Sequence, residues 1–190
     1  MKRMQFICAT VLALMAVGCA HGKMGAVDQA LEQGSFDKSA PIYVESINAK
    51  DTKFSGDKSG DAKTTDAARA KIEHTFSQKI VDELTKKGYN AKVASGDMKK
   101  GIVLTGNVSK IENGSAAARY FVGMGAGSAN MFTTFMLEDR DKKKTLSKFE
   151  IIGTSGAESK MGSYLDKHLD DGAKKTAEYI DQSLFPTKKK

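Results

Sequence analysis

The sequence predicts an α+β domain, a two-layer sandwich with two helices on one face of a mainly antiparallel or mixed sheet of about five strands. Apolar and polar residues alternate in short segments rich in β-branched and aromatic residues, which is typical of strands. Two longer segments repeat apolar residues every three to four positions, which is typical of amphipathic helices. Because each helix has one apolar stripe to bury, both are expected on the same face, and the other face of the sheet is then less covered.

The first strand and the first helix are predicted from the residues that follow Pro41. A strand is expected at Ile42–Ile47, and a hydrophilic loop follows at residues 51–63. The helix is expected to begin near Thr65 and to stop at Gly88, since glycine favours the C-terminal end of a helix. Its apolar stripe recurs at four-residue spacing and consists of Ile72, Phe76, Ile80 and Leu84.

Four more strands and a second helix follow. The strands are expected at residues 89–93, 102–111, 131–139 and 146–152. The charged residues of 139–144 predict a solvated turn, so the last two strands should pair antiparallel. The second helix is expected to open at Ser163 and to continue through Leu184, because Pro186 ends its apolar pattern.

Residues 1–18 have the layout of a secretory signal peptide. Two basic residues precede the apolar run Phe6–Ala16, and small residues then lead directly to Cys19, an arrangement that resembles a bacterial lipobox. The resemblance implies cleavage before Cys19 and attachment of diacylglycerol to its sulfur. Ordinary cleavage after Ala20 and a retained anchor are the alternatives, although the run is shorter than the roughly 20 apolar residues that a spanning helix needs.

This N-terminus sets the expected domain organisation. Residues 19–39 are expected to form a lipidated N-terminus and flexible tether, residues 40–185 a single periplasmic α+β domain, and residues 186–190 a basic tail. Ala20 follows the cysteine where lipoproteins retained at the inner membrane usually have aspartate. The resemblance to that sorting rule implies a lipid-anchored protein in the outer membrane, with its domain facing the periplasm.

Composition argues against nucleic-acid binding and against catalysis. The formal net charge is +7, but basic and acidic residues are interspersed rather than gathered as in a nucleic-acid-binding face. Of the three histidines, His21 lies near the expected anchor, and His74 and His168 lie in separate predicted helices without neighbours at metal-ligand spacing. The sequence also lacks a Gly-x-Ser-x-Gly motif and a cysteine outside the N-terminal 19 residues. We therefore expect no catalytic residues, metal, cofactor or small-molecule substrate, and a protein that is not an enzyme.

A glycine-rich run follows the third predicted strand. Residues Arg119–Ala129 read Arg-Tyr-Phe-Val-Gly-Met-Gly-Ala-Gly-Ser-Ala, after a Gly-Ser turn and before an alternating strand that ends in an acidic turn. This order resembles the hallmark of a bacterial lipoprotein family that is known only as a domain of unknown function. The resemblance covers residues 41–184 and implies an exported lipoprotein with a small α/β domain and no assigned activity.

The glycine-rich run has three interpretations. A phosphate-binding loop would need a glycine where Ser128 stands and a helix where a strand is predicted. The glycines can instead allow close backbone packing at the entry to a strand. The third interpretation is a partner-binding loop formed by Arg119, Tyr120, Phe121 and Met124, because aromatic residues, methionine and arginine are enriched at interfaces.

The expected function is that of an envelope lipoprotein that acts as a non-catalytic binding or accessory module for a periplasmic or outer-membrane complex. Its expected partners are the membrane, through the lipid anchor, and an envelope protein or the cell wall. The alternative is a ligand-binding or hydrolytic envelope domain whose site is assembled from residues distant in sequence.

Overall fold

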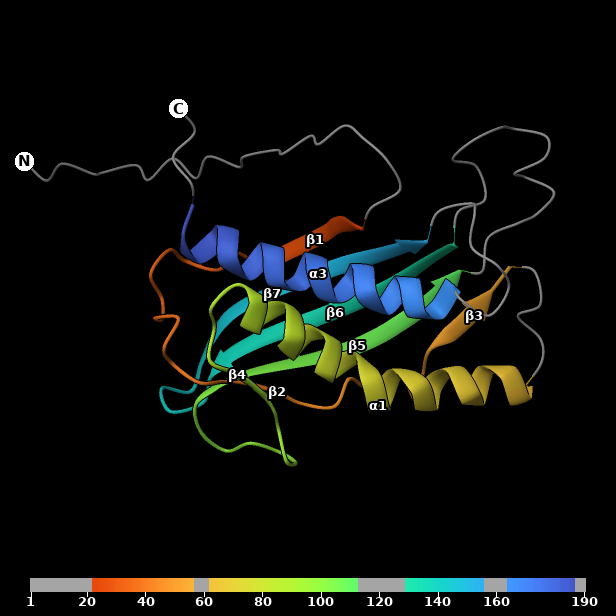
Figure 1. Ribbon diagram of the computed structural model, residues 1–190, viewed down its shortest axis with the longest axis horizontal. Helices are drawn as coiled ribbons and strands as arrows, with labels where there is room; N and C mark the ends of the chain where they lie inside the picture. The colour runs from red at the N-terminus through yellow and green to blue at the C-terminus, as the bar shows by residue number, and fades with distance from the viewer. Residues whose placement is uncertain (1–21, 57–61, 113–128, 156–163, 187–190) are drawn as a thin grey trace, which may run out of the picture.

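The computed structural model describes residues 22–56, 62–112, 129–155 and 164–186, which form two helices and a mixed seven-stranded sheet (Figure 1). The elements are β1 (Lys23–Gln29), β2 (Ile42–Val44), β3 (Lys53–Ser55), α1 (Ala62–Lys86), β4 (Ala91–Val93), β5 (Ile102–Glu112), β6 (Ala129–Asp139), β7 (Lys144–Ser155) and α3 (Tyr164–Leu184). The strands are ordered β1-β7-β6-β5-β2-β4, and β3 also pairs with β5. The β1, β7, β6 and β5 strands pair antiparallel, whereas β2, β3 and β4 join in parallel.

All five predicted strands and both predicted helices are present, with shifted ends. The helix α1 ends at Lys86, and Gly88 adopts a φ of 85° just beyond it, the left-handed conformation that glycine tolerates. Its four predicted stripe residues are fully buried. Both helices lie on one face of the sheet (Figure 1). The helical pattern therefore located each helix and also identified the face that it buries.

The predicted strand count of about five is too low, because β1 and β3 were not expected. The strand β3 has three residues within the hydrophilic loop and pairs with the end of β5, at Lys110–Glu112. So short a segment has no alternation to detect. The predicted strand at residues 42–47 is shorter than expected, since ladder pairing covers only Ile42–Val44.

The flexible tether expected at residues 19–39 is wrong for its described part. The strand β1 pairs antiparallel with β7, and its Met24 lies opposite Ile151. Leu31 and Phe36 beyond it are buried in the core, with exposed fractions of 5% and 9%. Six of the seven β1 residues are exposed, so its stability comes from backbone pairing with β7 rather than from an apolar pattern. This is why sequence periodicity did not reveal it.

The centre of the core is a row of aromatic rings between the sheet and the helices. Phe135 of β6 lies 6.1 Å from Phe76 of α1 and 5.5 Å from Phe149 of β7, measured between ring centroids. Phe149 in turn contacts Tyr179 of α3 at 4.2 Å. Gly106 of β5 makes room for this row, because an added Cβ would lie 2.8 Å from the Phe135 ring. The glycine thus allows the Phe135 ring to lie directly over the β5 backbone.

Candidate functional site

The residues predicted as functional lie outside the described part of the chain. These are the proposed lipid attachment residue Cys19 and the proposed partner-binding residues Arg119, Tyr120, Phe121 and Met124. The structure fixes only where their flanking residues lie. Glu112 at the end of β5 pairs with Asn130 of β6, and Lys23 at the start of β1 pairs with Ile152 of β7. Both flanks therefore lie toward the same end of the sheet.

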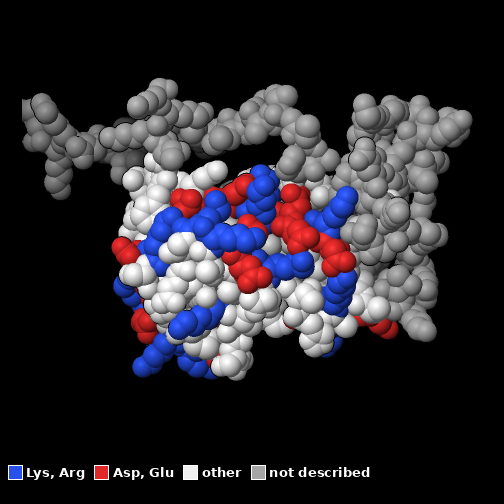
Figure 2. Space-filling view, in the orientation of Figure 1, with Lys and Arg blue, Asp and Glu red and all other residues white. Residues whose placement is uncertain are grey.

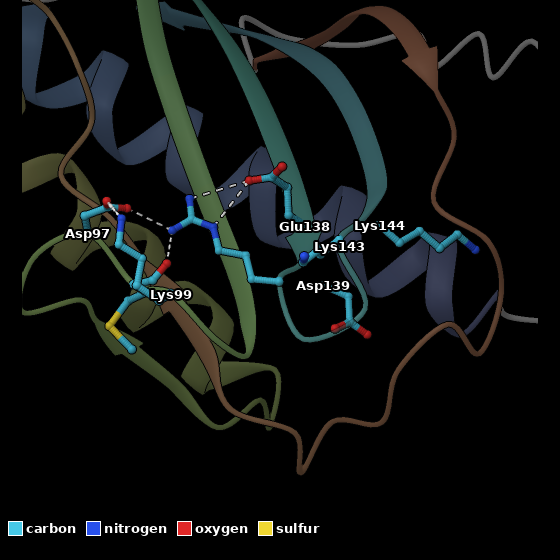
Figure 3. Close-up of a pocket in the computed structure, with 8 residues that line it drawn as sticks. Asp97, Lys99, Glu138, Asp139, Lys143 and Lys144 are labelled. Atoms are coloured by element: carbon cyan, nitrogen blue, oxygen red, sulfur yellow. Dashed lines mark hydrogen bonds and ion pairs between the residues drawn. The ribbon is translucent and has the colours of Figure 1, made fainter.

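A charged hollow of about 400 Å³ lies at the opposite end of β6, between the β4–β5 loop and the β6–β7 turn (Figure 3). It is lined by Asp97, Met98, Lys99, Glu138, Asp139, Arg140, Lys143 and Lys144. Figure 3 shows Asp97 and Glu138 approaching from opposite sides, whereas the side chain of Lys144 points away from them. The hollow thus combines residues from two connections that are distant in sequence.

Arg140 is the centre of this hollow. Its guanidinium donates to Glu45 Oε1 at 2.7 Å, to Asp97 Oδ1 at 3.1 Å and to the carbonyl of Met98. Its Nε lies 3.5 Å from Glu138 Oε2. The side chains of Arg140 and Glu45 are only 20% and 18% exposed, so this ion pair is partly shielded from water. Solvent shielding strengthens such contacts relative to those between fully exposed charges.

The backbone of the turn is held to the facing loop as well. The Arg140 N–H donates to the carbonyl of Gly101 at 3.0 Å, and the Gly101 N–H donates to Asp141 Oδ2 at 2.9 Å. The expectation of a solvated turn at residues 139–144 is therefore wrong for its first residues. Asp139 is 5% exposed, and Arg140 reaches over to the β4–β5 loop. Glu45 and Asp97 are far away in sequence, so no local signal indicated that this turn has ion-pair partners in other segments.

Two carboxylates of the hollow, those of Asp97 and Asp139, are held in the charged form. A hydrogen bond from Lys99 lowers the pKa of Asp97, and one from Lys142 lowers the pKa of Asp139. General acid catalysis near neutral pH uses a carboxyl group with a raised pKa. The pKa values of Asp97 and Asp139 are lowered rather than raised, so neither aspartate is suited to act as a general acid. They serve instead as hydrogen-bond acceptors and ion-pair partners. The arrangement clamps two loops together.

His168 of α3 is the one strongly buried histidine among the described residues, with an exposed fraction of 1%. Neither of its ring nitrogens has a hydrogen-bond partner within those residues. Burial lowers the pKa of His168 to about 4, so the ring is neutral at physiological pH. His74 on α1 is exposed. Within the described ranges, no group of three or more His, Cys, Asp and Glu residues is placed to hold a metal ion.

The helix-covered face carries both signs of charge. Figure 2 shows basic and acidic side chains interspersed over the helices. Ion pairs join the two helices, with Lys71 of α1 lying 2.7 Å from Asp166 of α3 and Lys79 also paired with Asp170. This mixture favours a solvated surface over a nucleic-acid-binding face.

The opposite face of the sheet has no described helix on it (Figure 1). Strand pairing aligns four residues in one row across this face, Lys110, Phe132, Ile152 and Lys23. Phe132 and Ile152 are half-buried, and the Lys110 ammonium lies 5.9 Å from the centre of the Phe132 ring. Two apolar side chains flanked by two lysines thus face away from the helices. We call these four residues the open-face row.

No helix in the described part of the chain is long and apolar enough to cross a membrane. The fold and surface define the class as a small α+β domain with a mixed sheet, two helices on one face and an open-face row on the other. Residues 42–159 match the family described as Domain of unknown function (DUF4410), and the chain belongs to that family. The expected membership of a family of unknown function is thereby confirmed.

The solved structures that match this chain are distant from it in sequence. The PelC dodecamer from Paraburkholderia phytofirmans is 14% identical, with a TM-score of 0.52 over 84% of this chain and 96% of that chain. Protein XCC0632 from Xanthomonas campestris is 11% identical, with a TM-score of 0.44 over 80% of this chain and 88% of that chain. No curated protein matches. The likeness to PelC shows a shared fold alone.

Proposed function

We propose that the protein is a bacterial envelope lipoprotein that acts as a non-catalytic binding or accessory module for a periplasmic or outer-membrane complex. Acyl chains on Cys19 hold it in the outer membrane, and its domain faces the periplasm. The signal-peptide layout and the cysteine that follows it support this anchoring. The resemblance of the glycine-rich run at residues 119–129 to the hallmark of a bacterial lipoprotein family also supports this anchoring.

The observation that carries the binding role is the open-face row. Phe132 and Ile152 lie directly opposite each other on adjacent antiparallel strands, so their side chains share one face. Lys110 and Lys23 extend the same row at either side. An apolar centre with a charged rim is the usual anatomy of a protein-binding surface. PelC is a dodecamer in its structure, so further copies of this chain are among the partners to test.

The alternative is a ligand-binding or hydrolytic domain, and the charged hollow would be its site. Its residues do come from distant segments, as that alternative requires. However, Arg140 already has three carboxylate partners, Glu45, Asp97 and Glu138, so its donors are satisfied within the chain. A ligand would have to replace these contacts, and we therefore favour the binding module.

Two measurements test this function. Mass spectrometry of the mature N-terminus should find a diacylglyceryl group and an amide-linked acyl chain on Cys19. A photo-crosslinking amino acid at Phe132 should capture a defined envelope protein in intact cells, whereas the same group at Gln78, exposed on α1, should not. Replacing Ile152 with Glu should then abolish the adduct. An unmodified N-terminus contradicts the anchor, and equal capture from both positions contradicts the binding face.

A further inference from the structure

The structured domain begins very close to the proposed lipid anchor. Only three Cα–Cα steps separate Cys19 from Gly22, a span of at most about 11 Å. A tether extending to residue 39 would have reached about 70 Å. Gly22 itself packs closely against α3, because an added Cβ would lie 2.5 Å from Asp171 Oδ2 and 2.9 Å from the Lys175 side chain. The anchor therefore fixes which part of the domain lies near the membrane.

The part nearest to the anchor is the edge strand β1. Its outer edge has no partner strand among the described residues. Met24 and Val27 lie opposite Ile151 and Phe149, so they extend the buried apolar face of β7 to the rim of the sheet. They are nevertheless 40% and 44% exposed. We call Lys23, Met24 and Val27 the β1 ledge; Met24 and Val27 lie on the helix-covered face of this edge, and Lys23, which also ends the open-face row, lies on the other face.

The charge on this ledge suits an anionic lipid surface. Asp28, the acidic residue of β1, is paired with Lys148 at 2.8 Å, whereas Lys23 forms no ion pair with another described residue, although the Glu150 side chain of β7 lies against the neighbouring Gly25. Basic residues close to a membrane are attracted to anionic headgroups. A short link to the anchor also gives the ledge a high effective concentration at the surface, so a weak contact suffices.

We propose that the β1 ledge lies against the membrane, with Met24 and Val27 among the lipid headgroups and the upper acyl chains and Lys23 on lipid phosphate. This inference rests on the proposed acylation of Cys19 and specifies how the domain sits on the bilayer. A second copy of the chain fits this edge less well. The pairing of β1 with β7 has two register shifts, between Met24 and Val27 and between Val27 and Gln29, and such irregularities disfavour edge-to-edge pairing.

The absence of tryptophan from the sequence permits a direct test. Met24→Trp and Val27→Trp each place one fluorophore on the ledge. Val93→Trp is the matched control, because Val93 is 41% exposed on β4 at the opposite edge of the sheet, about 24 Å away over five strand spacings. The acylated full-length proteins are reconstituted into vesicles of phosphatidylethanolamine and phosphatidylglycerol that contain a brominated phosphatidylcholine.

We expect tryptophan at positions 24 and 27 to shift its emission to shorter wavelength and to lose most of its fluorescence to the bromine atoms. Tryptophan at position 93 should do neither. Equal quenching at all three positions, or none at 24 and 27, overturns the proposal. A wavelength shift without bromine quenching also overturns it, because a second protein copy then covers the edge.

The anchor is checked on the same samples by mass spectrometry. Unquenched fluorescence from protein that carries its acyl chains and remains with the vesicles refutes the ledge contact alone. Protein that cells never acylate refutes the proposed function and the ledge contact together. The unacylated Cys19→Ser version of the Met24→Trp chain should lose quenching, since the contact depends on the short link to the anchor.

Discussion

Lowering the pH from 7 to 5 should destabilise the folded protein through one residue, His168. Its pKa falls from 6.5 to about 4 because the ring is buried. Between these two values the unfolded chain binds a proton at this histidine and the folded chain does not. Stability therefore rises with pH across this window and is lost as the pH falls below 6.5.

The pKa difference sets the size of the loss. A single group with these two pKa values removes about 2 kcal/mol of unfolding free energy at pH 5 and approaches about 3 kcal/mol near pH 4. Aspartates with lowered pKa values, such as Asp139 and Asp181, act in a lower range. Their stabilising contribution is lost only as the pH falls below 3.8, the value for an unperturbed aspartate. Between pH 7 and pH 5, the change in unfolding free energy therefore reports mainly on His168 and not on these aspartates.

Urea denaturation of the mature chain at several pH values measures the effect. His168→Leu removes the titrating group and its two unpartnered nitrogens, so the loss of stability between pH 7 and pH 5 should largely disappear. His74→Gln on the exposed side of α1 is the control and should keep the wild-type pH dependence. An unchanged pH dependence in His168→Leu, or its loss in His74→Gln, would refute the reasoning.

Three further substitutions probe packing and charge, each checked by urea denaturation at pH 7. Gly153→Ala should lower the free energy of unfolding by about 2 kcal/mol, because the new Cβ would lie 2.7 Å from the backbone oxygen of His168. Gly172→Ala should lower it by less than half as much, since the atoms nearest to that Cβ belong to side chains that can shift. Arg140→Met should lower the free energy of unfolding by about 2 kcal/mol, because it leaves the carboxylate partners of Arg140 unpaired. A loss below 0.5 kcal/mol (roughly that of an exposed ion pair) would contradict the view that Arg140 clamps the β6–β7 turn to the β4–β5 loop. Lys143→Gly should stabilise by about 0.5 kcal/mol, because Lys143 has a φ of 52° and glycine relieves that strain at some entropic cost, whereas Lys143→Ala should bring no gain.

The helices and central strands were predictable because their patterns are produced by burial. Phe76 recurs with its helical neighbours on the face that packs against the sheet, and it contacts Phe135 there. On β6 every second residue from Ala129 to Asp139 is buried, and the large apolar side chains Met131, Phe135 and Leu137 belong to this buried face. A pattern of this kind reports one buried face, and both helices and four of the five predicted strands have one. The fifth, β4, has no buried residue within Ala91–Val93, although Tyr89 just before it is buried.

The strand β1 was not predictable on these grounds. An edge strand can be stabilised by hydrogen bonds from its backbone alone, and backbone groups are the same in every sequence. Gly25 shows what this close approach requires, since an added Cβ would lie 2.9 Å from Glu150 Cβ on β7. The small residues of this segment indicated a flexible tether, yet small residues also allow two strands to pair closely. Composition alone does not distinguish a flexible tether from a closely paired edge strand.

The contacts of Arg140 with Glu45 and Asp97 show a second limit of prediction from sequence, which concerns charge rather than periodicity. A run of mixed charges in a turn normally faces water, and local sequence gives no reason to expect otherwise. The outcome changes when the chain brings Glu45 and Asp97 to the same place from two other segments. A cation between these carboxylates offsets their mutual repulsion. Arg140 supplies that positive charge, and the turn that carries it thereby becomes a tertiary contact.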